Sequence, residues 1–196
     1  MPPTAQEILD FWFGSPSDTG HAQPRTMWFK KDEAFDAQIV QRFGATLEGA
    51  LVGGIDDWIA PPLQALPALA RVLVLDQFTR NAFRGTARAF AGDEMALQGA
   101  RALVASGLDR ELGGVQRQFV YLPFEHSEDL AHQRTAVQLF IQLEREEPAL
   151  AGLAEWAQKH LDIVARFGRF PHRNAALGRA SSAEEIDFLK QPGSGF

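Results

Sequence analysis

The chain has 196 residues, of which 25 are acidic and 19 are basic, giving a formal net charge of -6, and it contains no cysteine. A chain of this length buries roughly 70% of the surface that its unfolded form exposes, which is enough for one self-sufficient domain. The missing cysteines exclude disulfides, thiolate metal ligands and cysteine nucleophiles, and they indicate a reducing, cytoplasmic location. The negative charge argues against a broad basic surface for nucleic acid.

The apolar runs of the sequence are too short for a membrane-spanning helix. The longest strongly apolar run, residues 68–75, is far below the roughly 18 residues that such a helix needs. The first residues also lack a cationic leader. We therefore expect a soluble protein with no membrane partner.

The first half of the chain predicts three main helices. Thr4 and Glu7 form a capping-box pattern, which predicts a helix that ends at Gly14. Asp32 predicts the start of a second helix. Five apolar residues then recur every four positions, namely Phe35, Ile39, Phe43, Leu47 and Leu51. The nearly all-apolar run at 68–75 predicts a third helix that lies at the centre of the core.

The second half predicts five further helices, bounded by caps, glycines or prolines. We expect them over 93–106, 112–122, 127–147, 148–167 and 181–189. Asp93 and Ser127 are the expected N-caps, and Pro123 is an expected stop. Ser181 and Glu184 have the spacing of a second capping box.

These patterns favour an all-α fold class. No run of alternating β-branched residues flanked by hairpin turns predicts a strand. We expect seven or eight helices in a single domain over residues 1–196, with 191–196 as a loose tail, or as a tether if Phe196 docks.

Three polar segments, each at a helix end, interrupt the apolar pattern. They are LDQFTRNAFRG at 75–85, LPFEHSEDL at 122–130 and RFGRFPHRNAALGR at 166–179. The third segment carries four arginines and a histidine but no acid, whereas the second has three acids around His126. Because the planar fork of arginine matches carboxylate and phosphate groups, the segments predict an arginine-rich polar site.

The binding hypothesis is a pocket in which these arginines hold a small anion, either a carboxylate or a phosphate. The asparagines add neutral donors and acceptors, and His126 or His172 can transfer a proton near neutral pH. The candidate ligand-binding residues are Asp76, Arg80, Asn81, Arg84, Glu125, His126, Glu128, His172, Arg173, Asn174 and Arg179. No cofactor is expected.

Three alternatives to ligand binding stay open at this point. The first is an internal network in which Asp76 pairs with Arg80, four residues later, and the acids of 122–130 pair with the remaining arginines. The second is an adapter that binds a peptide or protein partner through a repeat-like concave surface. The third is an enzyme in which His126 or His172 works with Glu125 or Glu128 as an acid–base pair.

A metal site has less support than any of these. Asp129 and His132 have a helical metal-ligand spacing, and Glu128 lies four residues before His132. No second pair of this kind occurs elsewhere to complete a coordination shell, so we expect no metal.

Four long strings of the sequence resemble a known family. They are WFKKDEAFDAQIVQRF at 28–43, LDQFTRNAFRGTARAFAGD at 75–93, YLPFEHSEDLAHQ at 121–133 and RFGRFPHRNAALGRASSAEEIDFL at 166–189. They look like a bacterial family catalogued as a domain of unknown function, number 924, over about Ile8 to Leu189. Thr79 departs from the family pattern, which tends to have proline there. The resemblance implies an all-helical architecture similar to tetratricopeptide repeats, although no 34-residue repeat is visible, and it implies no activity.

Overall fold

The computed structural model describes residues 3–195, and every regular element in this part of the chain is helical, as the all-α prediction requires. The chain divides into two compact units. Unit 1 holds Met1–Arg84 and Arg88–Pro123, and unit 2 holds Gly85–Ala87 and Phe124–Phe196. The single domain and the tetratricopeptide-like superhelix stay predictions, and the docking of Phe196 falls on a residue outside the described range.

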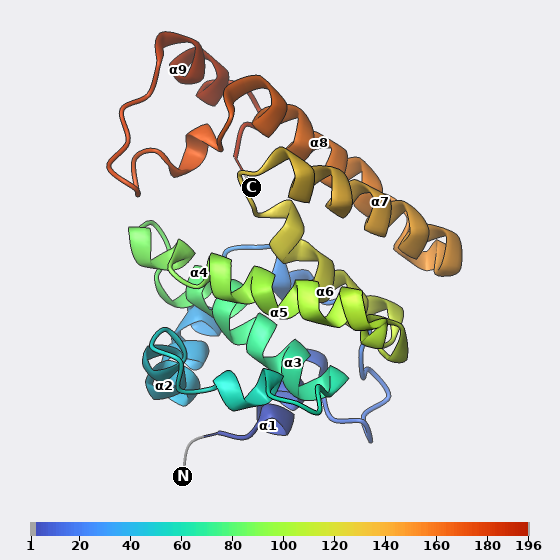
Figure 1. The fold of residues 1–196 in the computed structure, drawn as a ribbon. Helices are drawn as coiled ribbons and strands as arrows, with labels where there is room; N and C mark the ends of the chain where they lie inside the picture. Colours follow the sequence, from blue (N-terminus) through green and yellow to red (C-terminus); the bar gives the residue numbers. More distant parts are fainter. Residues whose placement is uncertain (1–2, 196) are drawn as a thin grey trace. The chain divides into compact units, whose positions relative to one another are not determined.

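Unit 1 contains α1 (Ala5–Phe13), α2 (Glu33–Ala50), α3 (Ala65–Val72), α4 (Thr79–Ala82), α5 (Asp93–Ser106) and α6 (Gly114–Glu125), whose last two residues belong to unit 2. Unit 2 contains α7 (Leu130–Glu146), α8 (Leu153–Phe167) and α9 (Ala183–Leu189). A π-helical turn, Leu73–Phe78, joins α3 to α4 without a break (Figure 1). The described residues thus form eight uninterrupted helical segments, within the predicted seven or eight.

Both helix starts predicted near the N-terminus are confirmed. Thr4 caps α1, since its hydroxyl accepts from Glu7 N at 3.3 Å while the Glu7 carboxylate accepts from Thr4 N at 2.7 Å. Asp32 caps α2 by accepting from the amides of Ala34 and Phe35 at 2.9 and 3.0 Å. These side chains satisfy donors that have no partner inside the helix.

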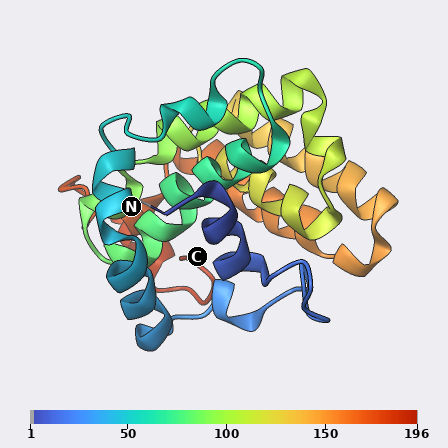
Figure 2. The same cartoon turned by 90° about the horizontal axis from the view of Figure 1, so that it is seen from below.

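Aromatic rings fill the core of unit 1. Trp12 of α1 is fully buried and its ring lies 5.5–5.8 Å, centroid to centroid, from four others: those of Trp28, Phe35, Phe78 and Phe119. α1 packs against α3, and Figure 2 shows the two helices from below, with α1 in dark blue. The central position predicted for the apolar run at 68–75 is confirmed, because these residues are all buried.

The π-helical turn is a feature that the apolar pattern does not predict. Side chains after the turn satisfy the carbonyls that a widened turn leaves exposed. Thr79 Oγ1 donates to the carbonyl oxygens of Leu75 and Asp76 at 2.8 and 3.3 Å, and Arg80 Nη1 also donates to Asp76 O, at 2.9 Å. Threonine at position 79 therefore stabilises this turn through its hydroxyl.

Gly92 lets the chain before α5 pass against the π-helical turn. A Cβ at this position would overlap the carbonyl oxygen of Leu75 and lie 2.9 Å from the Leu75 carbonyl carbon. The backbone at Gly92 has φ of -93°, which any residue adopts, so the requirement for glycine is steric. Gly92 is also the N-cap residue of α5, which corrects the prediction that Asp93 has this role.

Two expected helix boundaries around residue 125 are wrong. Pro123 lies inside α6 and does not end it, because proline near the end of a helix removes only one backbone hydrogen bond, to Phe119 O. Asp129, and not Ser127, caps α7 by accepting from the amides of Ala131 and His132. Ser127 Oγ instead accepts from Asp129 N at 3.2 Å.

The second capping box is shifted by one residue. Ser182 and Glu185 form it, with Glu185 Oε2 accepting from Ser182 N at 2.7 Å, because Glu184 points to Arg166 instead. The helix expected from Pro148 begins only at Leu153, after a short 3-10 turn.

Unit 2 is built on α7 and α8, which run side by side in opposite directions (Figure 1). Around the C-terminal end of α8, which Gly168 caps, a small core forms from Ile163, Val164 and Phe170, against which Phe167 and Phe188 pack. This core fixes the start of the loop that carries the third polar segment. Of the helices in the described residues, none has the length and apolar character needed to cross a bilayer.

Candidate functional site

The predicted site residues of unit 1 are held in two ion-pair clusters. In the first, Arg80 makes a fork to Asp93, with Nη1–Oδ1 and Nη2–Oδ2 distances of 2.7 and 3.1 Å, and contacts Asp76 at 3.0 Å. Asp76 is completely buried and also accepts from Gln77 Nε2 at 2.6 Å. Although desolvation opposes it, the two carboxylates raise the pKa of Arg80, which stays charged.

The second cluster of unit 1 centres on Asp36 of α2. Its carboxylate accepts from Arg84 Nε and Nη2, both at 3.0 Å, and from Asn81 Nδ2 at 2.7 Å. The sequence patterns do not predict a role for Asp36, because it is 45 residues from Asn81 and lies on a helix face with no distinctive motif. The spacing pattern gives no signal for such a long-range pair.

The third polar segment, RFGRFPHRNAALGR, lies in unit 2, and its arginines have partners within that unit. Arg179 forms a fork with Glu128 through Nη1–Oε2 and Nη2–Oε1 distances of 2.7 and 2.9 Å. Its Nε also donates to Asn174 Oδ1 at 2.9 Å and its Nη2 to Phe170 O at 3.0 Å. Although partial burial opposes it, hydrogen bonds from Arg179 and Phe170 N lower the pKa of Glu128.

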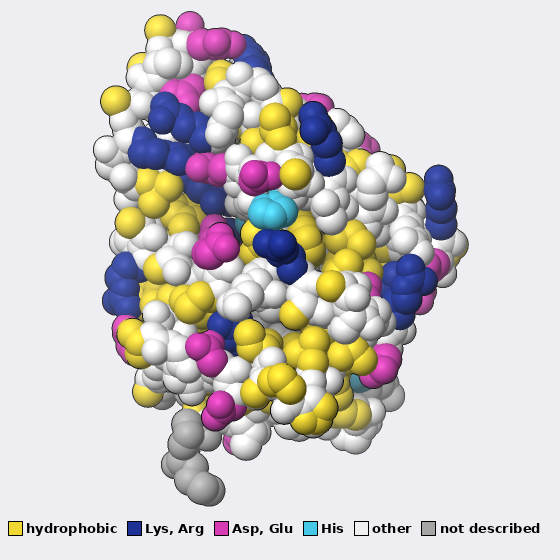
Figure 3. Space-filling model, in the orientation of Figure 1, with side chains coloured by type: hydrophobic (Ala, Val, Ile, Leu, Met, Phe, Trp, Pro, Cys, Tyr) yellow, Lys and Arg dark blue, Asp and Glu magenta, His cyan; other side chains and the backbone are white. Residues whose placement is uncertain are grey.

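Two further arginines of this segment pair with the capping region of α9. Arg169 forms a fork with Glu185 at 2.7 and 2.8 Å, and Arg166 contacts Glu184 at 2.7 Å on the surface. Hydrogen bonds from Arg169 and from Ser182 N lower the pKa of Glu185 to about 2. On the face in Figure 3, basic and acidic side chains accordingly lie next to each other at the α9 end of unit 2.

The fourth arginine of the segment, Arg173, lies deeper. It is 6% exposed, its guanidinium carbon is 4.7 Å from the centre of the Phe170 ring, and its Nη2 donates to His126 O at 2.9 Å. The His172 and His160 rings lie 5.5 and 5.6 Å from the same phenylalanine ring. The structure therefore brings together the second and third predicted segments around Phe170.

His160 is a member of this group that sequence reasoning missed, because it lies in the middle of α8. Its Nδ1 is 2.9 Å from Trp156 O and 3.2 Å from Glu125 Oε1, and both residues of this histidine–glutamate pair are buried. Since a carbonyl can only accept, we assign the proton to Nδ1. Burial lowers the pKa of His160 to about 3, helped by the nearby His126, His172 and Arg173, so the ring is neutral at pH 7.

We call Glu125, His126, His160, His172 and Arg173 the His/Arg cluster. The His160 and His172 rings and the Arg173 guanidinium lie against the Phe170 ring. The His126 ring, at 6.5 Å between centroids, and the Glu125 carboxylate are neighbours of His160. Glu125 contacts His160, and its pairing with His126 or His172 stays a prediction. Strongly shifted pKa values in buried groups of this kind are typical of functional sites.

Metal-ligand geometry does not occur among the residues that the structure describes, since no group of three or more histidine, aspartate or glutamate side chains there could hold an ion. Asp129 accepts from helix amides, and His132 Nδ1 lies 3.0 Å from Ser127 Oγ. Their spacing is explained by the start of α7.

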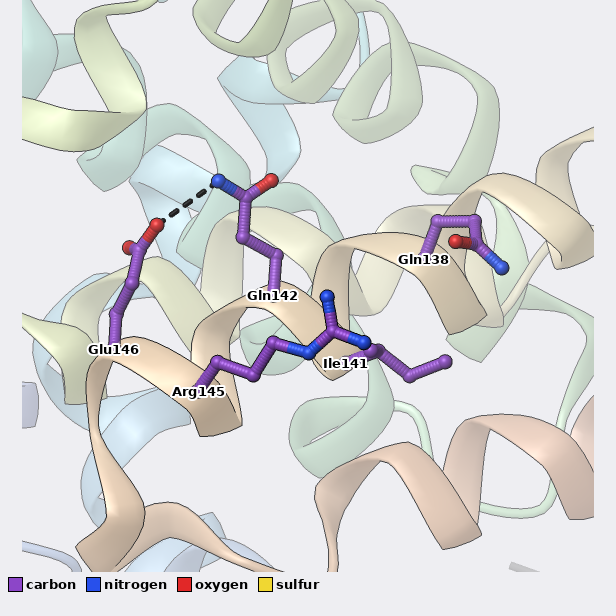
Figure 4. Close-up of a pocket in the computed structure, with 5 residues that line it drawn as sticks. All are labelled: Gln138, Ile141, Gln142, Arg145 and Glu146. Carbon is purple, nitrogen blue, oxygen red and sulfur yellow. Dashed lines mark hydrogen bonds between the residues drawn. The ribbon is translucent and has the colours of Figure 1, made fainter.

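Two surface hollows are lined by residues outside the cluster. One, of about 340 Å³, runs along α7 and is lined by Gln138, Ile141, Gln142, Arg145 and Glu146 (Figure 4). Its side chains project from successive turns of one helix, with Gln142 donating to Glu146 at 2.9 Å, and do not converge on a point. The other, of about 620 Å³, runs along α5 between Glu94 and Ala105. Neither has the converging polar groups of a ligand site.

The fold and the cluster define an all-helical protein in which a buried histidine and a buried arginine lie with two half-buried histidines. Residues 8–193 match the model of the family described as bacterial protein of unknown function (DUF924), and the chain belongs to this family. A solved structure of a protein of unknown function, ATU0120 from Agrobacterium tumefaciens, is similar at 40% identity and a TM-score of 0.78, covering 95% of this chain and 96% of that one. No curated protein matches the sequence.

Proposed function

We propose that the protein is a cytoplasmic binding protein that holds a small anion, a carboxylate or a phosphate, in the His/Arg cluster of unit 2. The observation that carries the proposal is the gathering of two imidazoles, those of His160 and His172, and the buried Arg173 guanidinium at the Phe170 ring, with the His126 ring 6.5 Å from that of His160. Burying such groups costs free energy of folding, and recognition of an anion is a reason to keep them together.

Each member of the cluster has a distinct part in this proposal. Arg173 supplies the charged fork, and the His126 and His172 rings donate hydrogen bonds to the oxygens of the anion. In this proposal the buried pair of Glu125 and His160, whose ring is 6.5 Å from that of His126, supports the site without contacting the anion. Arg169 and Arg179 do not contact the anion, because carboxylates of unit 2 already occupy their forks.

The four predicted residues of unit 1 are left out of the proposed site. Asp76, Arg80, Asn81 and Arg84 have partners within unit 1, so the internal-network alternative explains their positions. The same alternative explains three of the four arginines of the third polar segment, Arg166, Arg169 and Arg179.

A thermal-shift series with inorganic phosphate, citrate and a peptide with a free C-terminal carboxylate tests the proposal. Ligand at a hundredfold excess over its Kd stabilises the folded state by about 2.7 kcal/mol, which raises the Tm of a chain of this size by roughly 5–10 °C. We expect Arg173→Gln to lose this rise and Arg166→Gln to keep it, since Arg166 pairs with Glu184 on the surface and contacts the rings of Phe167 and Phe188, outside the cluster.

The outcomes separate the alternatives. A rise with the peptide alone favours the adapter. No rise with any probe, or an undiminished rise in Arg173→Gln, contradicts anion binding at the cluster.

Proton transfer at the bound ligand is a second candidate function, favoured by the 3.2 Å contact between Glu125 and His160. Because its pKa is about 3, His160 binds a proton too weakly to be the base near pH 7, so the imidazole that takes the proton in this candidate is that of His126 or His172. In that case His126→Asn or His172→Asn, which has no basic nitrogen, loses turnover.

A further inference from the structure

We infer that Glu128 is a positioning residue for the His/Arg cluster: it fixes the backbone that carries His172 and Arg173, and does not contact the ligand. The inference rests on the proposed function, since it concerns the same site. This positioning role differs from the ligand contact that the sequence pattern predicts for Glu128.

Glu128 uses both carboxylate oxygens to hold the loop between α8 and α9. Its Oε1 accepts from the backbone amide of Phe170 at 2.7 Å and from Arg179 Nη2 at 2.9 Å. Its Oε2 accepts from Arg179 Nη1 at 2.7 Å. One side chain at the start of α7 thus holds both ends of the stretch 170–179.

Arg179 links Glu128 to further groups of the loop by hydrogen bonds. It donates to Phe170 O at 3.0 Å and to Asn174 Oδ1 at 2.9 Å, and its own amide donates to Asn174 O at 2.8 Å. Asn174 is 1% exposed, and its Nδ2 donates to Ser181 Oγ at 3.0 Å. His172 and Arg173 lie between the two residues, Phe170 and Asn174, that this network fixes. Side chains that bind a ligand need such support to hold their geometry.

The sign of one effect separates positioning from simple electrostatics. Replacing Glu128 by glutamine removes a negative charge and leaves the Arg179 fork less neutralised, so the field alone would tighten the binding of an anion. Loss of the hydrogen bonds that fix residues 170–179 weakens the binding of the anion. A weaker binding of phosphate in Glu128→Gln therefore cannot come from the charge.

The experiment is calorimetric titration of the full chain with inorganic phosphate. We expect Glu128→Gln to bind at least tenfold more weakly than the natural sequence, and Glu128→Asp, which keeps the charge, to recover part of the loss. Glu184→Gln is the matched control, because it removes the same group from an exposed pair with Arg166 of the same polar segment. This control binds phosphate as the natural sequence does.

Equal or tighter binding in Glu128→Gln overturns the inference and leaves the proposed function standing. No binding of phosphate by the natural sequence overturns both. If Glu128→Gln does not fold, Arg179→Lys replaces it, since lysine keeps the charge and loses the fork. Undiminished phosphate binding in Arg179→Lys likewise overturns the inference.

Discussion

Gly92→Ala is expected to destabilise unit 1 by about 3 kcal/mol or more, at the upper end of what an added methyl group costs in a packed region. The new Cβ would overlap the carbonyl oxygen of Leu75, and that oxygen belongs to backbone and cannot swing away. Leu75 O also accepts from Thr79 Oγ1, so a shift of the π-helical turn would break a second contact. Urea denaturation followed by circular dichroism measures the loss.

Gly44→Ala is the matched control for this prediction. Gly44 lies within α2, and a Cβ there meets nothing within 4 Å. Alanine in the middle of a helix is more stable than glycine by roughly 0.5–1 kcal/mol, so this variant is expected to gain stability. A Gly92→Ala protein as stable as the natural one would refute the close packing of the chain on the π-helical turn.

The second large effect is a loss of stability in mild acid that depends on His160. Its pKa is lowered from 6.5 to about 3, so between these values the unfolded state binds the proton and the folded state does not. Stability is therefore complete above pH 6.5 and falls as the pH drops below it, by up to about 1.4 kcal/mol per pH unit. Burial is the main cause of the shift of the pKa, the hydrogen bond to Trp156 O opposes it, and His126, His172 and Arg173 favour it. The Glu125 carboxylate also faces the ring, 3.2 Å from Nδ1.

His160→Asn isolates this contribution. Asparagine keeps a donor for Trp156 O but cannot take up a proton in this range, so the slope of Tm between pH 6.5 and 4.5 should become shallower than in the natural protein. Glu185 and Glu128 have lowered pKa values, and their stabilisation is lost only below about pH 4.5, outside this window. Identical slopes in the two proteins would contradict a buried neutral His160.

Local sequence signals predicted the helices well and the exact boundaries less well. The Thr4 box and the Asp32 cap were read correctly because each depends on residues two or three positions apart. The π-helical turn at Leu73–Phe78 could not be predicted, since it depends on Thr79 and on the approach of Gly92 from another part of the chain. In the second capping box, two adjacent serines and two adjacent glutamates left the register open.

The candidate site, like the helix boundaries, was predicted only in part. The acids of 122–130 were expected to pair with arginines, and Glu128 does so with Arg179, 51 residues away. Arg166 and Arg169 instead use Glu184 and Glu185, whose capping pattern gave no hint of a partner 16 or 18 residues before them. The position of His160 in the His/Arg cluster depends on tertiary packing, because no motif or spacing near it in the sequence indicates a functional site.

The most direct test of anion binding is a long-range ¹H–¹⁵N NMR spectrum of the five histidine rings during titration with inorganic phosphate at constant ionic strength. We predict saturable shifts of the His126 and His172 ring nitrogens, with His21 and His132 unmoved, because these two lie elsewhere, against Gly14 O and Ser127. Histidine signals that stay fixed, or that all move together without saturation, would contradict a specific anion site in the His/Arg cluster.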